Sequence, residues 1–94
     1  MDNQEQFLEA VNDFQIAAQK NNGFTAERWL NVAYKLDYIS LHCKENIDAL
    51  LRKRNEIQHF DAKHRISKQD IKDMVAITKI ATNTKFWPIQ LSSI

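Results

Sequence analysis

Glycine and proline are almost absent from this sequence, which contains one of each, Gly23 and Pro88, in 94 residues. All-β domains need many tight turns, and these two residues supply much of the backbone geometry of such turns. Apolar residues instead recur every three or four positions, the spacing of the buried face of an α-helix. We therefore predict an all-α fold, a four-helix up-and-down bundle, with the 94 residues forming one domain around one modest core.

The first helix is predicted over residues 3–21. Asp2 can cap it, and Glu5 stands three residues later, in the arrangement of a capping box. Gly23 can take the left-handed conformation that ends a helix, and Phe24 can fold back onto the last turn. Four residues at 4-3-4 spacing form the apolar stripe: Phe7, Val11, Phe14 and Ala18.

The second helix is predicted over residues 25–39, with Thr25 as its N-cap, and the third over 45–59. The pattern weakens between them, so either a break near residues 40–44, which we favour, or one long helix with a bend fits. Trp29 and Tyr34 are assigned to core or dimer contacts rather than to base stacking. The apolar stripes are Trp29, Val32, Ala33, Leu36 and Ile39 in the second helix and Ile47, Leu50, Leu51 and Ile57 in the third.

The fourth helix is predicted over residues 68–84, where Ser67 is the N-cap and Asp70 the third helical residue of a capping box. Pro88 prevents the helix from extending further, which leaves a short apolar tail at 85–94. Its Phe86–Ile89 cluster is expected to dock on the bundle; the alternative is a surface for a partner. The stripe of this helix is Ile71, Met74, Val75 and Ala81, with Ile77 and Ile80 beside it.

Arg54, Asn55 and His59 are the candidate catalytic residues. The guanidinium group of an arginine can bind a phosphate through two parallel hydrogen bonds, and a histidine can take and give a proton near neutral pH. Asn55 and His59 are four positions apart and share a helix face, but Arg54 lies about 140° from His59 around a straight helix. A helix that ends near His59, or a second copy of the chain, could bring them together. The alternative is that Arg54 is a solvated charge and His59 a polar residue near a helix end.

The pattern Arg54-Asn55-x-x-x-His59 resembles the motif of the HEPN family, the higher-eukaryote and prokaryote nucleotide-binding domains. The resemblance implies a small helical bundle, a symmetric homodimer that brings two motifs together, and metal-independent endoribonuclease activity. It also implies a toxin–antitoxin or phage-defence setting, with a cognate antitoxin protein as a further partner. The alternative is a non-catalytic HEPN-like module that binds a protein or a nucleotide.

Positive charge surrounds this motif. Residues 44–72 contain eight Lys or Arg against five Asp or Glu, although the formal net charge of the chain is only +1. We expect Lys53, Lys63, His64 and Arg65 to contact RNA, mainly through its phosphates. The alternative for residues 61–65 is an ordinary solvated connection. A DNA-binding helix is a weaker interpretation, because acidic residues such as Glu56 interrupt the basic ones.

No cofactor or metal is expected. His42, Cys43, His59 and His64 lack the paired spacing of a zinc site, and nothing near Cys43 in the sequence marks a reactive thiol. A lone cysteine fits a reducing compartment. The sequence has no apolar run long enough to span a bilayer and no signal-peptide pattern, so we expect a soluble cytoplasmic protein.

Overall fold

A computed structural model describes residues 2–60 and 65–84, with the backbone alone for residues 59 and 60. Four α-helices follow one another: α1 (Asn3–Gln19), α2 (Ala26–Lys35), α3 (Leu41–Phe60) and α4 (Lys68–Asn83). No β-strand occurs among these residues, so the predicted all-α fold with four helices is confirmed. The predicted tail cluster at 86–89 lies outside the described residues.

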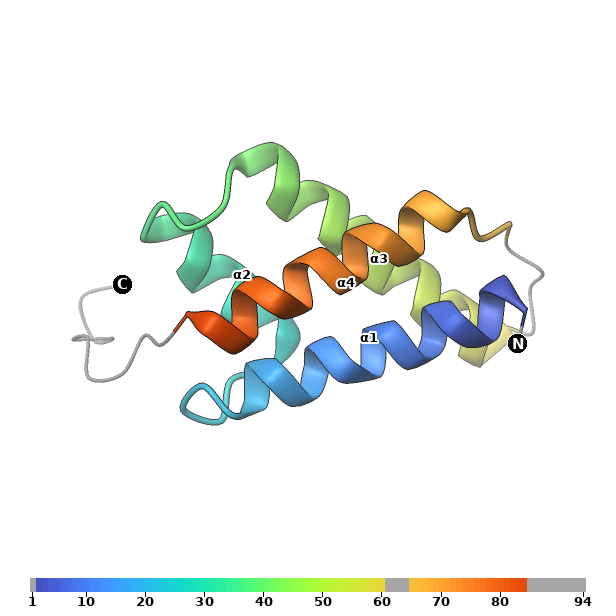
Figure 1. Cartoon of the computed structure of the whole chain (residues 1–94), viewed down its shortest axis with the longest axis horizontal. Coiled ribbons are helices and arrows are strands. Elements are labelled where there is room, and N and C mark those ends of the chain that lie inside the picture. Colours follow the sequence, from blue (N-terminus) through green and yellow to red (C-terminus); the bar gives the residue numbers. More distant parts are fainter. Residues whose placement is uncertain (1, 61–64, 85–94) are drawn as a thin grey trace.

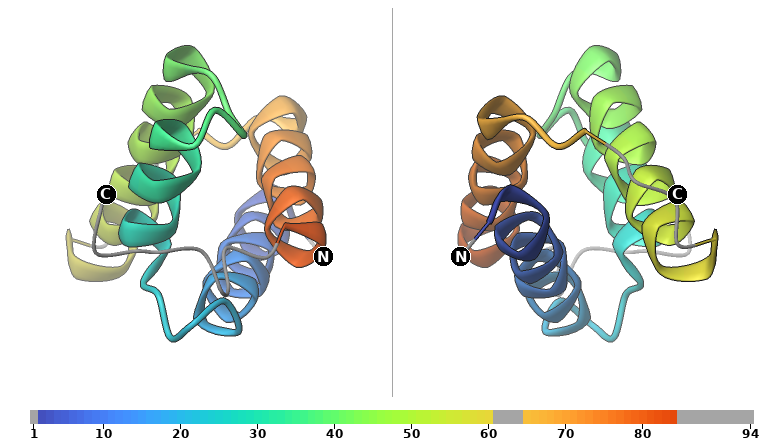
Figure 2. Two further views of the ribbon diagram at one scale, coloured as in Figure 1. Left: turned by 90° about the vertical axis from the view of Figure 1, so that its left-hand side faces the viewer. Right: turned by 90° about the vertical axis from the view of Figure 1, so that its right-hand side faces the viewer.

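The helices form two pairs, α1 with α4 and α2 with α3, as the end-on views show (Figure 2). The contact between α1 and α4 is the most extensive, and these two helices run in the same direction (Figure 1). Asn3 Nδ2 donates to the carbonyl oxygen of Ile66 at 3.1 Å, and Asn21 Nδ2 donates to that of Thr84 at 2.7 Å. These two hydrogen bonds join the helices near both of their ends.

The parallel direction of α1 and α4 differs from the alternating directions of a regular up-and-down bundle. The reason is the length of α2, which has 10 residues where α1 has 17. At 1.5 Å per residue, α2 is too short to carry the chain back along α1. The 20-residue helix α3 makes the return alone, so α4 starts at the same end of the molecule as α1.

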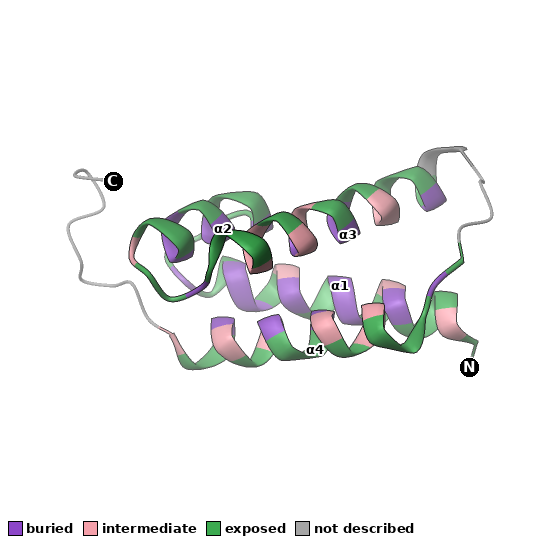
Figure 3. Cartoon of the chain, turned by 90° about the horizontal axis from the view of Figure 1, so that it is seen from above, coloured by how far each residue is buried: buried purple, intermediate pink, exposed green. Residues whose placement is uncertain are grey.

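The core lies where the helices face one another (Figure 3). All four residues of the stripe predicted for the first helix are buried, as are all four of the third. At the centre, the rings of Phe14 and Trp29 meet edge to face with their centroids 5.6 Å apart, and both side chains are fully buried. The assignment of Trp29 to the core is confirmed, whereas Val75 was wrongly placed there and is 43% exposed.

The connection between α2 and α3 occupies residues 36–40, earlier in the chain than predicted. The second helix ends at Lys35 because Asp37 adopts a left-handed backbone with φ of 63°, which cannot continue a helix. Ser40 then begins α3, since its Oγ accepts a hydrogen bond from the backbone N–H of Cys43 at 3.0 Å. The alternative of one long bent helix is therefore wrong, and the predicted start at residue 45 was late.

The other helix ends follow the predicted signals. Asp2, Thr25 and Ser67 each accept a backbone N–H at their N-cap, and the capping box of Ser67 with Asp70 is complete. Gly23 has the expected left-handed φ of 74°, and it follows Asn22, which is also left-handed. Two left-handed residues reverse the chain so that α1 ends at Gln19, slightly before the predicted residue 21.

Candidate functional site

The Arg54–His59 motif lies in the last turns of α3. Arg54 is half-buried and Asn55 exposed, and Arg54 Nη1 donates to Asn55 Oδ1 at 3.1 Å. Because α3 continues to Phe60, positions 54 and 59 belong to one uninterrupted helix. Their angular separation is therefore the full one of an α-helix, about 140°. The helix does end near His59, as predicted, because Phe60 is its last residue, but positions 54 and 59 both lie before that end.

Lys53 is paired with another helix. Its Nζ lies 3.2 Å from Asp70 Oδ2 of α4, and about a third or less of each side chain is exposed. The same carboxylate oxygen accepts the backbone N–H of Ser67 at 3.2 Å. Much of the positive charge of Lys53 is therefore balanced within the fold, which leaves less of it for a phosphate than the sequence implied.

The remaining predicted RNA-contacting residues divide into two groups. Arg65 is exposed and stands just before the capping box of α4, while Lys63 and His64 lie outside the described residues. The end of α3 and the start of α4 are at the same end of the molecule (Figure 1). Arg65 and the motif therefore occupy the same end, as the sequence interpretation requires.

Cys43 is partly buried beside a polar contact between α3 and α4. Asp73 accepts a hydrogen bond from Asn46 Nδ2 at 3.0 Å and another from Gln69 Nε2 at 2.8 Å. Burial raises the pKa of the Cys43 thiol, and the negative charge of Asp73 raises it further. A raised pKa keeps the thiol protonated, which is the opposite of what a nucleophilic cysteine needs. Among the described residues, no group of three His, Cys, Asp or Glu side chains could hold a metal ion.

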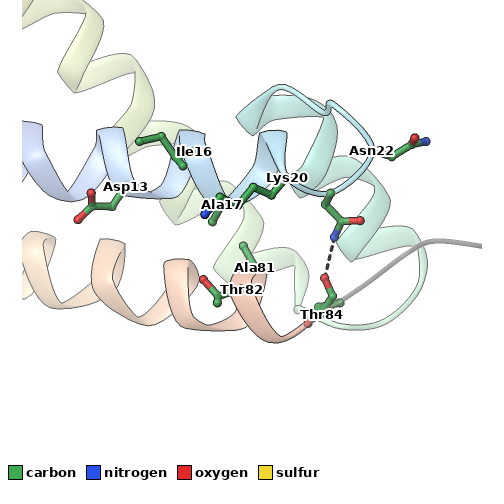
Figure 4. Close-up of a pocket in the computed structure, with 9 residues that line it drawn as sticks. Asp13, Ile16, Ala17, Lys20, Asn22, Ala81, Thr82 and Thr84 are labelled. Atoms are coloured by element: carbon green, nitrogen blue, oxygen red, sulfur yellow. Dashed lines mark hydrogen bonds between the residues drawn. The ribbon is translucent and has the colours of Figure 1, made fainter.

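A cavity of about 440 Å³ opens between the C-terminal halves of α1 and α4 (Figure 4). These halves lie at the other end of the molecule from the end of α3, which carries the motif (Figure 1). The sequence analysis did not identify this cavity. The signal in the sequence is Ile16, an apolar residue outside the predicted stripe of the first helix, since such a residue can indicate a surface that something covers. In the structure its side chain is 44% exposed. The residues that line the cavity are Asp13, Ile16, Ala17, Lys20, Asn21, Asn22, Ala81, Thr82 and Thr84.

Comparisons of the chain with models of known protein families, with curated proteins and with solved structures found no significant match. None of the helices in the described ranges combines the length and the apolar character needed to cross a membrane. The described part is thus a small four-helix domain.

Proposed function

We propose that this protein is a metal-independent endoribonuclease of the HEPN type that acts as a homodimer. We also propose that it acts as a toxin or a phage-defence component and that a cognate antitoxin protein is its partner. The observation that carries it is the hydrogen bond between Arg54 and Asn55 on α3, one turn before His59. This bond gives the guanidinium group a defined position while part of its surface stays open to solvent.

The uninterrupted helix supports a site built from two chains. Since Arg54 and His59 of one chain are about 140° apart around α3, one phosphate cannot easily meet both from the same side. A two-fold axis beside the end of α3 would place the motif of a second chain opposite the first. Each chain supplies one motif histidine, and acid–base cleavage of RNA uses one base and one acid, so two chains complete the set.

The chemistry follows from the residue types. His59 of one chain removes the proton from a ribose 2′-hydroxyl, whose oxygen attacks the neighbouring phosphorus atom. The P–O5′ bond breaks, and His59 of the other chain protonates the departing 5′-oxygen. Arg54 stabilises the negative charge that grows on the phosphate in the transition state, and Asn55 holds Arg54 or contacts the phosphate directly. The products are a 2′,3′-cyclic phosphate and a free 5′-hydroxyl.

Cleavage of labelled single-stranded RNA tests this proposal. We expect cleavage that persists in the presence of a chelator and fails at a 2′-deoxy linkage, because the 2′-oxygen is the nucleophile. His59→Ala should slow cleavage on the order of 10²-fold or more, since it removes the proton carriers of both chains. Arg54→Ala should slow it on the order of 10²–10³-fold by removing positive charge from the phosphate site.

Two variants on the same helix serve as matched controls. Arg52→Ala removes an exposed arginine two residues from Arg54, and Gln58→Ala changes the exposed neighbour of His59. Both should cleave RNA at nearly the rate of the unmodified protein. The proposal is wrong if pure protein leaves varied RNAs intact, or if His59→Ala cleaves as well as Gln58→Ala.

A non-catalytic HEPN-like module that binds a protein or a nucleotide is the second candidate. The pairing of Lys53 with Asp70 favours it, because this pair balances a charge that an RNA-binding surface would otherwise use. Binding of labelled RNA or of a nucleotide without any cleavage product would support this second function over the first.

A further inference from the structure

A groove with apolar and polar walls lies between α1 and α4. The 440 Å³ cavity and a smaller one of about 110 Å³ are neighbours in it, since Asp13 lines both. Ile16 lines the larger cavity and Val75 the smaller, and these side chains are 44% and 43% exposed. Two large aliphatic side chains exposed along one groove mark a surface that gains stability when something apolar covers it.

The floor of this groove consists of small side chains. Ala17 of α1 and Ala81 of α4 line the larger cavity, and both residues are buried. Alanines at these positions let the two parallel helices approach while leaving a recess between the larger residues. A recess of a few hundred Å³ with an apolar floor is large enough for an aromatic ring.

Residue 84 leads the chain directly to the edge of this groove. Thr84 lines the larger cavity, and its carbonyl oxygen is held at 2.7 Å by Nδ2 of Asn21, a residue that is only 7% exposed (Figure 4). Its backbone is extended, with φ of −106° and ψ of 120°, so the helical path has already ended there. The chain thus leaves α4 at a fixed point beside the recess.

The sequence that follows is rich in apolar residues. Phe86 and Trp87 come two and three residues after Thr84, within about 11 Å of it even for a fully extended chain. Pro88 cannot continue a helix, and Ile89 adds a further aliphatic side chain. Thr84, Ala81 and Ala17 line the same cavity. A segment that starts at Thr84 and extends about 11 Å can therefore reach the part of the cavity near Ala81 and Ala17.

We propose that residues Phe86–Ile89 fold back from Thr84 and occupy the groove between α1 and α4, with an aromatic side chain over Ala17 and Ala81. The occupant is this segment of the same chain because the chain is already tethered at the edge of the groove. A tether of two or three residues gives a high effective concentration and avoids the entropy cost of bringing in a second molecule. This docking is independent of the ribonuclease proposal, since the motif lies at the other end of the molecule.

Quenching of tryptophan fluorescence by acrylamide tests the docking. The chain has two tryptophans, and Trp29 is fully buried, so any readily quenched emission belongs to Trp87. Trp87→Phe isolates the signal of Trp29. Docked Trp87 should be quenched several-fold less than in a peptide of residues 84–94, and Ile16→Lys, which places a charge in the groove, should restore peptide-like quenching.

Leu41→Lys is the matched control, because Leu41 is 49% exposed on α3 and lines neither cavity. It should leave the quenching of Trp87 unchanged, and circular dichroism should show that both lysine variants are folded. The inference is overturned if Trp87 in the unmodified protein is quenched as readily as in the peptide, or if Ile16→Lys and Leu41→Lys have the same effect.

A disulfide experiment separates docking within one chain from docking between two chains. In a Cys43→Ser background, cysteines at positions 16 and 89 should form an intramolecular disulfide when the protein is oxidised at low concentration. Cysteines at positions 4 and 89 should not, because Gln4 is three turns away along α1. A disulfide that forms only between two chains, or equally from positions 16 and 4, would overturn the inference.

Discussion

The carboxylate of Asp70 serves two structural roles with a single oxygen: it accepts the backbone N–H of Ser67 and lies 3.2 Å from the ammonium group of Lys53. The first contact completes the capping box of α4, and the second joins α4 to α3. Lys53 therefore differs from Arg65, which is exposed and forms no ion pair with the residues that the structure describes.

Lys53→Ala should weaken RNA binding less than Arg65→Ala. A lysine or arginine that contacts phosphate changes the slope of log affinity against log salt concentration by about 1, and Lys53 already has a balancing carboxylate. Anisotropy of labelled RNA over a range of salt concentrations measures both slopes, in a His59→Ala background that prevents cleavage. Asp70→Asn should strengthen binding by freeing Lys53. Equal slopes for Lys53→Ala and Arg65→Ala would contradict the prediction.

Ser67→Ala should lower the free energy of unfolding by about 0.5–2 kcal/mol. The substitution removes the hydroxyl that accepts the backbone N–H of Asp70 at 3.1 Å, which leaves a helix-end donor without its partner. Urea denaturation measures the loss. Ser67→Asn is the control, because asparagine is as good an N-cap as serine, and it should retain nearly all of the stability. A loss as large in Ser67→Asn as in Ser67→Ala would show that the cap is not responsible.

Phe14→Ala should lower the free energy of unfolding by about 3–5 kcal/mol, the usual range for removing a large buried aromatic side chain. Phe14 is fully buried and packs against Trp29, so the loss includes a cavity and an edge-to-face contact. The comparison is Leu41→Ala, which removes a side chain that is 49% exposed and lines neither cavity, and it should change stability by roughly 0.5 kcal/mol or less. Similar losses in the two variants would mean that Phe14 is not central to the core.

Cys43 should react slowly with a thiol reagent at neutral pH, because burial and the charge of Asp73 raise its pKa. Asp73→Asn should move the midpoint of the rate–pH profile to lower pH, although burial, the larger cause, remains. Asp48→Asn is the control, since Asp48 pairs with Lys44 at 3.0 Å. An unchanged profile in Asp73→Asn would contradict the assigned cause.

The same pKa shift affects stability. The folded chain holds the Cys43 proton more tightly than the unfolded chain, whose thiol has an ordinary pKa of about 8.5. The free energy of unfolding should therefore be highest below that pH, as far as this group is concerned. It should fall as the pH rises towards and through the higher folded-state value. Cys43→Ser should remove this part of the pH dependence.

Local signals in the sequence were sufficient for most helix ends and for most of the core. An N-cap acts through a hydrogen bond to a residue three positions away, so Ser67 with Asp70 could be recognised without knowing the fold. The buried stripe from Phe7 to Ala18 could also be predicted, because the residues on one side of a helix recur every three or four positions. Ser40 was readable in principle as well, but the weak pattern around it concealed the cap.

Features that depend on contacts between helices could not be read in this way. Val75 follows the apolar spacing of α4 yet lies on the side towards the groove, which depends on how α4 rotates against α1. The pairing of Lys53 with Asp70 joins residues 17 positions apart, and only the packing of α3 on α4 brings them together. For the candidate site, the residue types could be predicted from their spacing, whereas the uninterrupted course of α3 through the motif required the structure.

The parallel direction of α1 and α4 has a mechanical consequence. Residue 2 and residue 84 lie at opposite ends of the molecule, whose described part extends 41 Å along its long axis. A force that pulls these two residues apart therefore acts along the interface of α1 and α4 and tends to slide one helix past the other. The hydrogen bonds at both ends and the buried contacts between them must yield together rather than one after another. This chain should therefore resist stretching more strongly than a bundle in which the first and last helices are antiparallel and can peel apart from one end.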